Sequence, residues 1–203
     1  MPFSDFTLPD LETKVGVRLG DAPDLHATVA ESVPRPALAA LLDVYLPLAA
    51  LIGTEKAKSE LIVAPVLLEV WELFHRRIGF FSGTEFNVDK VRGLNGLCDF
   101  ILSRSDVQVV LKAPVAVVVE AKDDSIAGGL GQCGAEMVAA RIFNEKAGNG
   151  IEVIHGCVTT GTLWRFMTLR GDDLTIDRTQ YTLPEKLAKV LGILVHAVGG
   201  PLP

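Results

Sequence analysis

The spacing of hydrophobic and polar positions changes several times along the 203-residue chain, and each change predicts a different element. Two mainly apolar stretches predict helices at about 36–51 and about 55–76. Because Pro65 interrupts the second stretch, we expect that helix to kink or split there. Residues 1–34 contain several prolines and show no regular period. We interpret them as an irregular N-terminal arm, with at most one strand at 14–18, before a single domain over 35–203.

The second half of the chain alternates between short apolar runs and turn residues, which is typical of strands. The predicted strands lie at about 84–88, 97–103, 115–121, 151–158, 163–169 and 174–178. A helix at about 130–147 separates the third strand from the fourth, and a last helix runs from Pro184 to about Val198. This order predicts an α/β protein whose mixed central sheet is flanked by helices.

The predicted strand at 115–121 is apolar and then ends in charge, with Glu120 followed by Lys122. Alternate residues of a strand point to the same face, so we expect these two side chains to be neighbours. Asp99 lies in the preceding apolar strand, and adjacent strands are about 4.8 Å apart. Asp99 and Glu120 can therefore share one Mg²⁺, or Mn²⁺ in its place, because these ions prefer oxygen ligands. Lys122 is then placed to position an attacking water or to stabilise charge on a phosphate.

This arrangement resembles the PD-(D/E)XK nuclease superfamily, which has the restriction-endonuclease-like fold. The matching residues are Asp99 on the second strand, Glu120-Ala121-Lys122 on the third, and Gln132 early in the next helix. The resemblance implies a core of order αβββαβ and Mg²⁺-dependent cleavage of phosphodiester bonds. It further implies that Asp99 and Glu120 bind the metal, that Lys122 is the catalytic lysine and that Gln132 orients groups nearby. Residue 98 is Cys where the family motif has Pro.

Residues 59–67 also resemble the helix that precedes the core in type I restriction-subunit nuclease domains, and roughly 55–170 is similar to an uncharacterised bacterial family. In such families this helix often supplies a further acid near the metal. Glu60 is the favoured candidate and Glu69 the alternate. They are nine residues apart, which places them on opposite faces of a continuous helix unless Pro65 resets the phase. Glu136, one turn after Gln132, can lie on the same helix face, but it is interpreted as a solvated partner of Arg141 or Lys146 rather than a metal ligand.

Two other classes of function remain open. Gly129 to Gly134 spells G-x-G-x-x-G, the pattern of a dinucleotide-binding loop. However, about six residues separate Lys122 from its first glycine, where the fingerprint expects a tight turn. We therefore favour Gly128 and Gly129 as a flexible lead-in that lets substrate approach the metal. The other class is a catalytically silent nuclease fold that serves interaction or assembly.

Composition limits the partners that we expect. The net charge is −6, which argues against a protein permanently bound to nucleic acid but permits transient binding, with DNA favoured over RNA. The mean hydropathy of +0.35 favours a homo-oligomer, most simply a homodimer. Residues 36–53 are barely long enough to span a bilayer and contain Asp43, so no membrane partner is expected. Three scattered cysteines and the absence of a recognisable signal peptide favour a cytoplasmic protein with buried, unreactive thiols. His75 and His155 are assigned ordinary structural roles.

Overall fold

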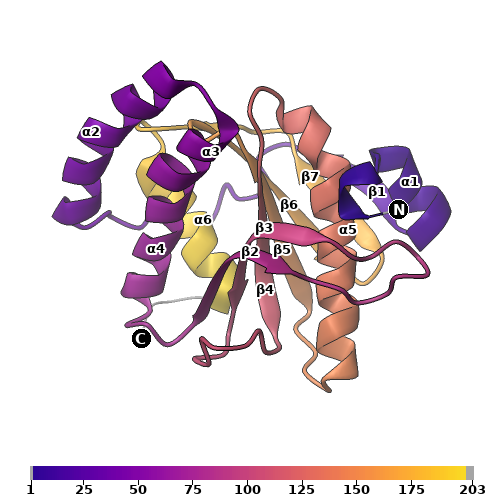
Figure 1. Ribbon diagram of the computed structural model, residues 1–203. Coiled ribbons are helices and arrows are strands. Elements are labelled where there is room, and N and C mark those ends of the chain that lie inside the picture. The colour runs from indigo at the N-terminus through magenta and orange to yellow at the C-terminus, as the bar shows by residue number, and fades with distance from the viewer. Residues whose placement is uncertain (1, 200–203) are drawn as a thin grey trace.

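The computed structural model describes residues 2–199 and contains one eight-stranded sheet between two layers of helices (Figure 1). The strand order is β1-β7-β6-β5-β4-β3-β2, and β8 pairs with β6 outside this path. The sheet is mixed, because β1 with β7 and β4 with β5 are parallel whereas the other pairs are antiparallel. The predicted α/β class with a mixed sheet flanked by helices is therefore confirmed.

The strands agree closely with the sequence pattern in the middle of the sheet. They are β1 (Arg18–Ala22), β2 (Gly79–Glu85), β3 (Leu97–Ser103), β4 (Val115–Ala121), β5 (Val153–Thr159), β6 (Leu163–Arg170), β7 (Asp173–Asp177) and β8 (Tyr181–Thr182). The predicted strand at 84–88 is displaced, because β2 starts five residues earlier. Gly83 is not a turn before the strand. It lies inside β2 with φ of +60°, and the register of β2 against β3 is the same on both sides of it.

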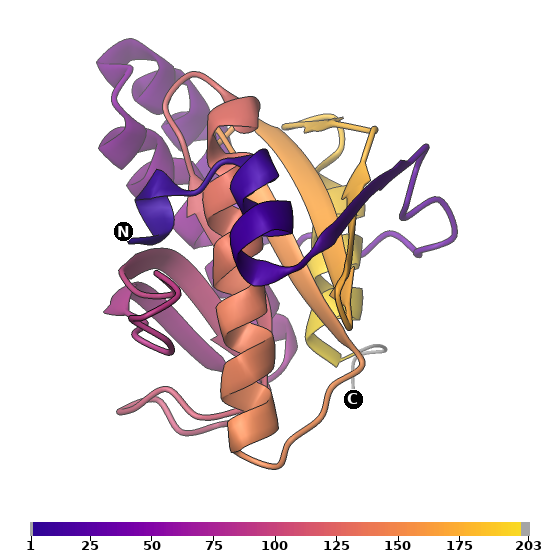
Figure 2. The ribbon, with the colours of Figure 1, turned by 90° about the vertical axis from the view of Figure 1, so that its right-hand side faces the viewer.

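The helices form two layers on opposite faces of the sheet (Figures 1 and 2). One layer contains α2 (Pro36–Ile52), α3 (Glu55–Lys58), the π-helical turn η2 (Ser59–Val63), α4 (Ala64–Leu73) and α6 (Leu187–Gly199). The other contains the 3₁₀ turn η1 (Phe3–Asp5), α1 (Leu8–Val15) and α5 (Ile126–Lys146). The expected interruption at Pro65 takes the form of the π turn, in which the Ala64 N–H bonds to the Ser59 carbonyl.

The N-terminal segment is not the irregular arm that its prolines suggest. Thr7 and Asp10 form a capping box at the start of α1, and Pro9 lies in the first helical turn, where its missing N–H costs nothing. The predicted strand at 14–18 is also wrong, because α1 continues to Val15 and β1 begins at Arg18. Phe3, Phe6 and Leu11, all fully buried, anchor this segment on α5. The first helix therefore extends the hydrophobic core.

The core lies on both faces of β4, whose seven residues are all buried. Val117 and Val119 pack under the layer of α4 and α6, whereas Val118 packs under α5. The three cysteines are buried and unpaired, as expected. Within residues 2–199, no helix combines the length and the apolar character needed to cross a membrane.

Glycines let α1 approach α5 closely, as Figure 2 shows for the two helices. A Cβ atom added to Gly131 would lie 2.6 Å from the carbonyl carbon of Thr7, so there is no room for a side chain. Gly134 faces Leu11 in the same way, one turn further along α5. By contrast, a Cβ on Gly128 would meet nothing within 4 Å. The glycines of the G-x-G-x-x-G sequence therefore lie inside a helix and form a packing surface.

We expect Gly131→Ala to lower the free energy of unfolding by about 1–3 kcal/mol, because the new methyl group meets backbone atoms that cannot move aside. The matched control is Gly128→Ala, which should raise stability by up to about 1 kcal/mol, since Ala favours helix and has open space there. Urea unfolding of both variants measures the difference. Equal stability of the two would contradict the close packing of α1 on α5.

Candidate functional site

The paired strands β3 and β4 place the first two predicted site residues together. Phe100 lies opposite Val119, and continuing this register by one residue sets Asp99 opposite Glu120. One carboxylate oxygen of Asp99 accepts a hydrogen bond of 2.8 Å from the Ala121 N–H. The pairing of these two strands, predicted from sequence, is confirmed. It brings two carboxyl groups to the end of the most deeply buried strand.

Side chains from β4, the residue after it and α5 then form a connected network. Lys122 Nζ lies 2.6 Å from Glu120 Oε1 and donates a hydrogen bond of 3.1 Å to Gln132 Oε1. Gln132 Nε2 donates to Glu136 Oε1 at 3.2 Å. Gln132 and Glu136 are four residues apart on one face of α5, and this face packs on β4. Gln132 thus connects the lysine of the strand to an acid of the helix.

The network excludes most water, and burial sets the charge of its acids. Burial and the nearby charge of Asp99 raise the pKa of Glu120 to about 7, although Lys122 opposes the shift. Burial raises the pKa of Glu136 well above its usual range, and the Glu120 charge adds to the effect. Burial lowers the pKa of Lys122, but the ion pair with Glu120 outweighs this, so its pKa is raised. Glu136 therefore holds a proton near neutral pH while Lys122 is charged.

Each of the two buried acids keeps one oxygen without a hydrogen-bond partner among the described residues, Glu120 Oε2 and Glu136 Oε2. The two carboxyl groups are neighbours, because the charge of Glu120 helps to raise the pKa of Glu136. If one carboxyl group is protonated, its O–H can donate to an oxygen of the other, so that both groups gain a hydrogen-bond partner. A cation bound to Glu120 is the alternative way to compensate these oxygens.

Glu136 is the residue that sequence reasoning placed wrongly. It is 0 % exposed and is no solvated partner of Arg141, which instead pairs with Asp172. The error arose because α5 is buried on nearly every side, so its sequence has no polar stripe that marks an outer face. The spacing of four residues from Gln132 is the signal that identifies Glu136 as a member of the same face.

The acids proposed from the preceding helix lie elsewhere. Glu60 is exposed and pairs with Lys56 at 2.7 Å. Glu69 is buried, but its carboxylate binds the Arg35 guanidinium and accepts the Arg35 N–H at 2.8 Å, which fixes the start of α2. The structure thus records other partners for both residues, and the helical acid that it brings to Glu120 is Glu136. In the layer of α3 and α4, the acid whose charge raises the pKa of Lys122 is Glu55, at the start of α3.

The glycines before Gln132 are not a flexible lead-in, because α5 already begins at Ile126. A Cβ on Gly129 would lie 2.6 Å from Val158 Cγ1 and 3.1 Å from Lys122 Cγ. Only a glycine here lets the helix come near enough for Gln132 to hold Lys122. A dinucleotide site needs a glycine-rich loop before its helix, but here all three glycines of the pattern lie within α5.

Divalent metal fits this site only with water as a major ligand. Within residues 2–199, no three His, Cys, Asp or Glu side chains converge as a metal-binding group. Mg²⁺, however, is commonly held by one or two carboxylates and keeps several waters. Asp99, beside Glu120 with its unpartnered Oε2, supplies such a pair. Lys122 is the cation that neutralises Glu120 in the structure as it stands.

Comparisons with known proteins gave no significant match to a protein-family model, to a curated protein or to a solved structure. The geometry of the site therefore carries the functional argument.

The raised pKa values of the acids predict a pH dependence of stability. Folded Glu120 and Glu136 bind protons more tightly than they do in the unfolded chain, where a Glu pKa is 4.5. Their stabilising contribution is therefore complete below that pH and is lost as pH rises through about 7. For each proton released, the free energy of unfolding falls by up to about 1.4 kcal/mol per pH unit. We expect Glu136→Gln to flatten this slope in urea unfolding between about pH 5 and 7.

The matched control is Glu60→Gln, which alters an exposed ion pair and should leave the slope as in the wild type. The pKa of His155, lowered to about 3 by burial, contributes a slope of the opposite sign in all three proteins. It cancels in the comparison. Parallel stability profiles for wild type and Glu136→Gln would show that the two acids do not share a proton.

Proposed function

We propose that the protein is a Mg²⁺-dependent nuclease that hydrolyses phosphodiester bonds of nucleic acid, DNA in preference to RNA. The observation that carries this proposal is that Asp99 and Glu120 lie just beyond the last β3–β4 pair, close enough for their charges to interact, with Lys122 2.6 Å from Glu120. The succession α4, β2, β3, β4, α5, β5 follows the order αβββαβ, which supports a restriction-endonuclease-like core. Gln132 lies early in the helix after the third strand, as the proposal requires.

The residues of the site divide the chemistry between them. Asp99 and Glu120 would hold the metal, which would supply positive charge to a phosphate oxygen and lower the pKa of an attacking water. The Gln132 amide oxygen accepts a hydrogen bond from Lys122 and so keeps the ammonium in place independently of its ion pair with Glu120. Lys122 then orients the water or stabilises negative charge on the phosphate. Glu136, protonated, holds Gln132 through its amide N–H.

Basic side chains outside this network offer contacts to phosphates. Lys90 and Arg92 line a hollow of about 300 Å³ together with Lys14 of α1. The net charge of −6 limits nonspecific binding, so this local patch supports a transient grip on the substrate. The three buried, unpaired thiols support the further proposal of a cytoplasmic protein.

A catalytically silent module is the second candidate, and one observation favours it. Lys122 supplies a counter-charge to Glu120 and is held by Gln132, so the network can act as a structural ion-pair cluster. Interaction or assembly would then be the function of the fold. The two candidates differ in metal binding and in cleavage.

We expect Lys122→Ala to reduce the rate of phosphodiester cleavage at least about 100-fold, because it removes the ammonium beside Glu120 that is proposed to act on the water or the phosphate. Single-stranded, duplex and branched DNA, and the corresponding RNAs, are incubated with Mg²⁺ or Mn²⁺. Lys56→Ala, which removes an exposed lysine, is the control and should cleave at the wild-type rate. Cleavage by Lys122→Ala at the wild-type rate would refute the mechanism.

Metal binding is measured on the same proteins by thermal unfolding. Mg²⁺ or Mn²⁺ should raise the Tm of the wild type and of Lys56→Ala but not that of Asp99→Ala, since a ligand that binds only the folded state stabilises it. If neither ion raises the Tm of the wild type and no substrate is cleaved, the silent module is the correct candidate.

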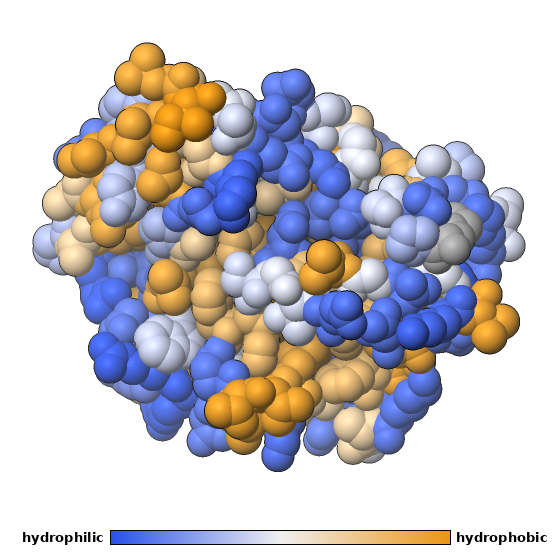
Figure 3. Space-filling view, in the orientation of Figure 1, coloured by the Kyte–Doolittle hydropathy of each residue, from blue (hydrophilic) through white to orange (hydrophobic). Residues whose placement is uncertain are grey.

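We also propose that the protein is a homodimer formed through α2. This 17-residue helix carries a single charged residue, Asp43, yet one side of it faces solvent. Its exposed apolar residues form the orange patch over α2 in Figure 3, and they are Leu41, Val44, Leu48, Leu51 and Ile52. Leu51 alone is 86 % exposed. Helices that lie on membranes carry Lys and Arg beside their apolar face, and α2 contains neither, so a second copy of α2 is the matching partner.

We expect Leu48→Glu to convert a dimer into a monomer, because two such helices packed on each other would bury the new carboxylates. The masses are measured by light scattering after gel filtration, and the monomer weighs 21.8 kDa. Val109→Glu, which adds the same charge at an exposed loop position, should leave the dimer intact. A wild type that is monomeric at all concentrations measured would refute the proposal.

A further inference from the structure

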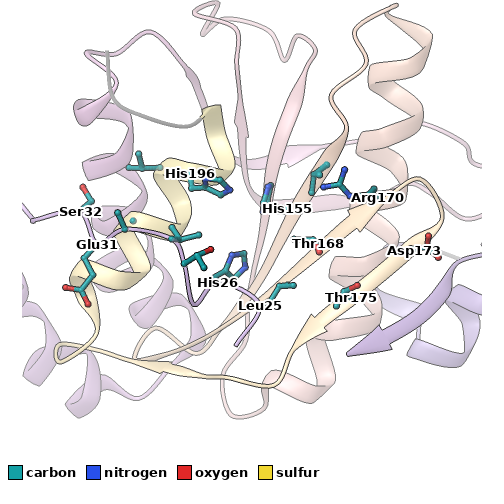
Figure 4. Close-up of a pocket in the computed structure, with 16 residues that line it drawn as sticks. Leu25, His26, Glu31, Ser32, His155, Thr168, Arg170, Asp173, Thr175 and His196 are labelled. Carbon is teal, nitrogen blue, oxygen red and sulfur yellow. The ribbon is translucent and has the colours of Figure 1, made fainter. Parts of the chain in front are cut away.

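Three of the four histidines of the chain meet in one cavity, far along the sequence from one another (Figure 4). His26 follows β1, His155 lies in β5 and His196 lies in α6. The ring centre of His155 is 6.2 Å from that of His26 and 6.1 Å from that of His196. The cavity encloses about 780 Å³, which is within the range of small-molecule sites.

Two of these rings are buried, and each has one ring nitrogen without a hydrogen-bond partner among the described residues. His26 is 3 % exposed and His155 is 9 % exposed. Among the described residues, neither His26 Nε2 nor His155 Nδ1 has a hydrogen-bond partner. An unpaired buried polar atom destabilises the folded state, so such atoms are rare in folded proteins. Both residues line the same cavity, so one molecule there contacts both imidazole rings.

The cavity is built by the fold itself, through the segment 24–32 that crosses over the sheet. Lys189 of α6 donates to the Val29 carbonyl at 2.6 Å, and the Ser32 N–H bonds to the Ala188 carbonyl at 2.9 Å. Gly192 lets the backbone at Ala30 lie directly against α6. These bonds fix the wall of the cavity on the helix.

The charges around His155 favour an anion. Burial lowers the pKa of this imidazole to about 3, and the nearby basic groups His26, His196 and Arg104 lower it further. Around His26, by contrast, Asp177 and Asp24 raise the imidazole pKa, although burial outweighs them. Arg170, which pairs with Glu152, lies at one end of the cavity and Glu31 at the other, while Val153 and Val195 supply apolar wall. The carboxylate of Asp173, which also borders the cavity, is paired with Arg18 at 2.6 Å. An imidazole that stays neutral offers an N–H donor to an anion at low desolvation cost.

We propose that this cavity binds a small organic anion, a carboxylate or phosphate group carried on an apolar body, with the anionic group at His155 between His26 and His196. The site is separate from the Glu120 network. His155 shares its face of β5 with Cys157, which packs in the layer of α6, whereas Glu120 pairs beside Val158, which packs in the layer of α5. The proposal does not depend on nuclease activity. A metal ion is the rival ligand, but the described residues contain no three-residue metal-binding group.

Two-dimensional NMR of the histidine rings in the ¹⁵N-labelled full-length protein tests this proposal. Phenyl phosphate and benzoate, which share one apolar body, should each shift the ring signals of His26, His155 and His196. His75 lies outside the cavity and should not move. The stronger of the two probes identifies the phosphate or the carboxylate as the preferred group. Benzyl alcohol, the neutral analogue, should shift the three signals much less.

Variants then locate the anionic group. His155→Gln should weaken binding of the stronger probe at least about tenfold, the equivalent of one hydrogen bond to a charged group. His196→Gln, at an exposed position, gives the same test without disturbing a buried ring. His75→Gln is the control and should bind the probe as the wild type does. Equal shifts with benzyl alcohol, no shift with any probe at millimolar concentration, or tight Zn²⁺ binding that replaces anion binding would each overturn the proposal.

Discussion

The buried ion pair of Glu120 and Lys122 is the interaction on which the arrangement of the α5 layer depends. A carboxylate at the end of a strand buried on both faces loses its hydration, and this loss is compensated only if counter-charge and hydrogen bonds replace the water. Lys122 supplies the charge, and Gln132 supplies the hydrogen bond that fixes it. Gln132 reaches Lys122 only because Gly129 lets α5 lie directly against the strand. The ion pair of Glu120 and Lys122 therefore depends on the close packing of α5 at Gly129.

The same close packing couples the network to the N-terminal helix. Gly131 and Gly134 continue the series that begins with Gly129, and they let α1 lie against the outer side of α5. The helix α5 therefore lies between the sheet and α1, with Gln132 and Glu136 on the side that packs on the sheet. The high pKa of Glu136 follows from its burial on that side, next to Glu120.

The sequence predicted the central strands well and the N-terminal layer poorly, for physical reasons. The strands at 97–103 and 115–121 are continuous apolar runs with charged or polar ends, and burial on both faces requires that pattern. From these runs the pairing of Asp99 with Glu120 followed directly. The position of Glu136 did not, because a helix buried all round has no polar face to count from. Similarly, Pro9 starts a helix when a capping box precedes it, but read alone it indicates a break.

Unpartnered buried atoms connect the two proposed sites. Among the described residues, seven buried side-chain nitrogen or oxygen atoms lack a hydrogen-bond partner, and four belong to Glu120, Glu136, His26 and His155. Folding compensates most buried polar groups within the chain, so two such groups of unpaired atoms are unusual. The acids at the α5 face favour a proton or a cation, whereas the cavity at the α6 face, with basic groups near His155, is the proposed anion site. One sheet thus presents sites of opposite charge preference on its two faces, and the apolar strands between them keep the two apart.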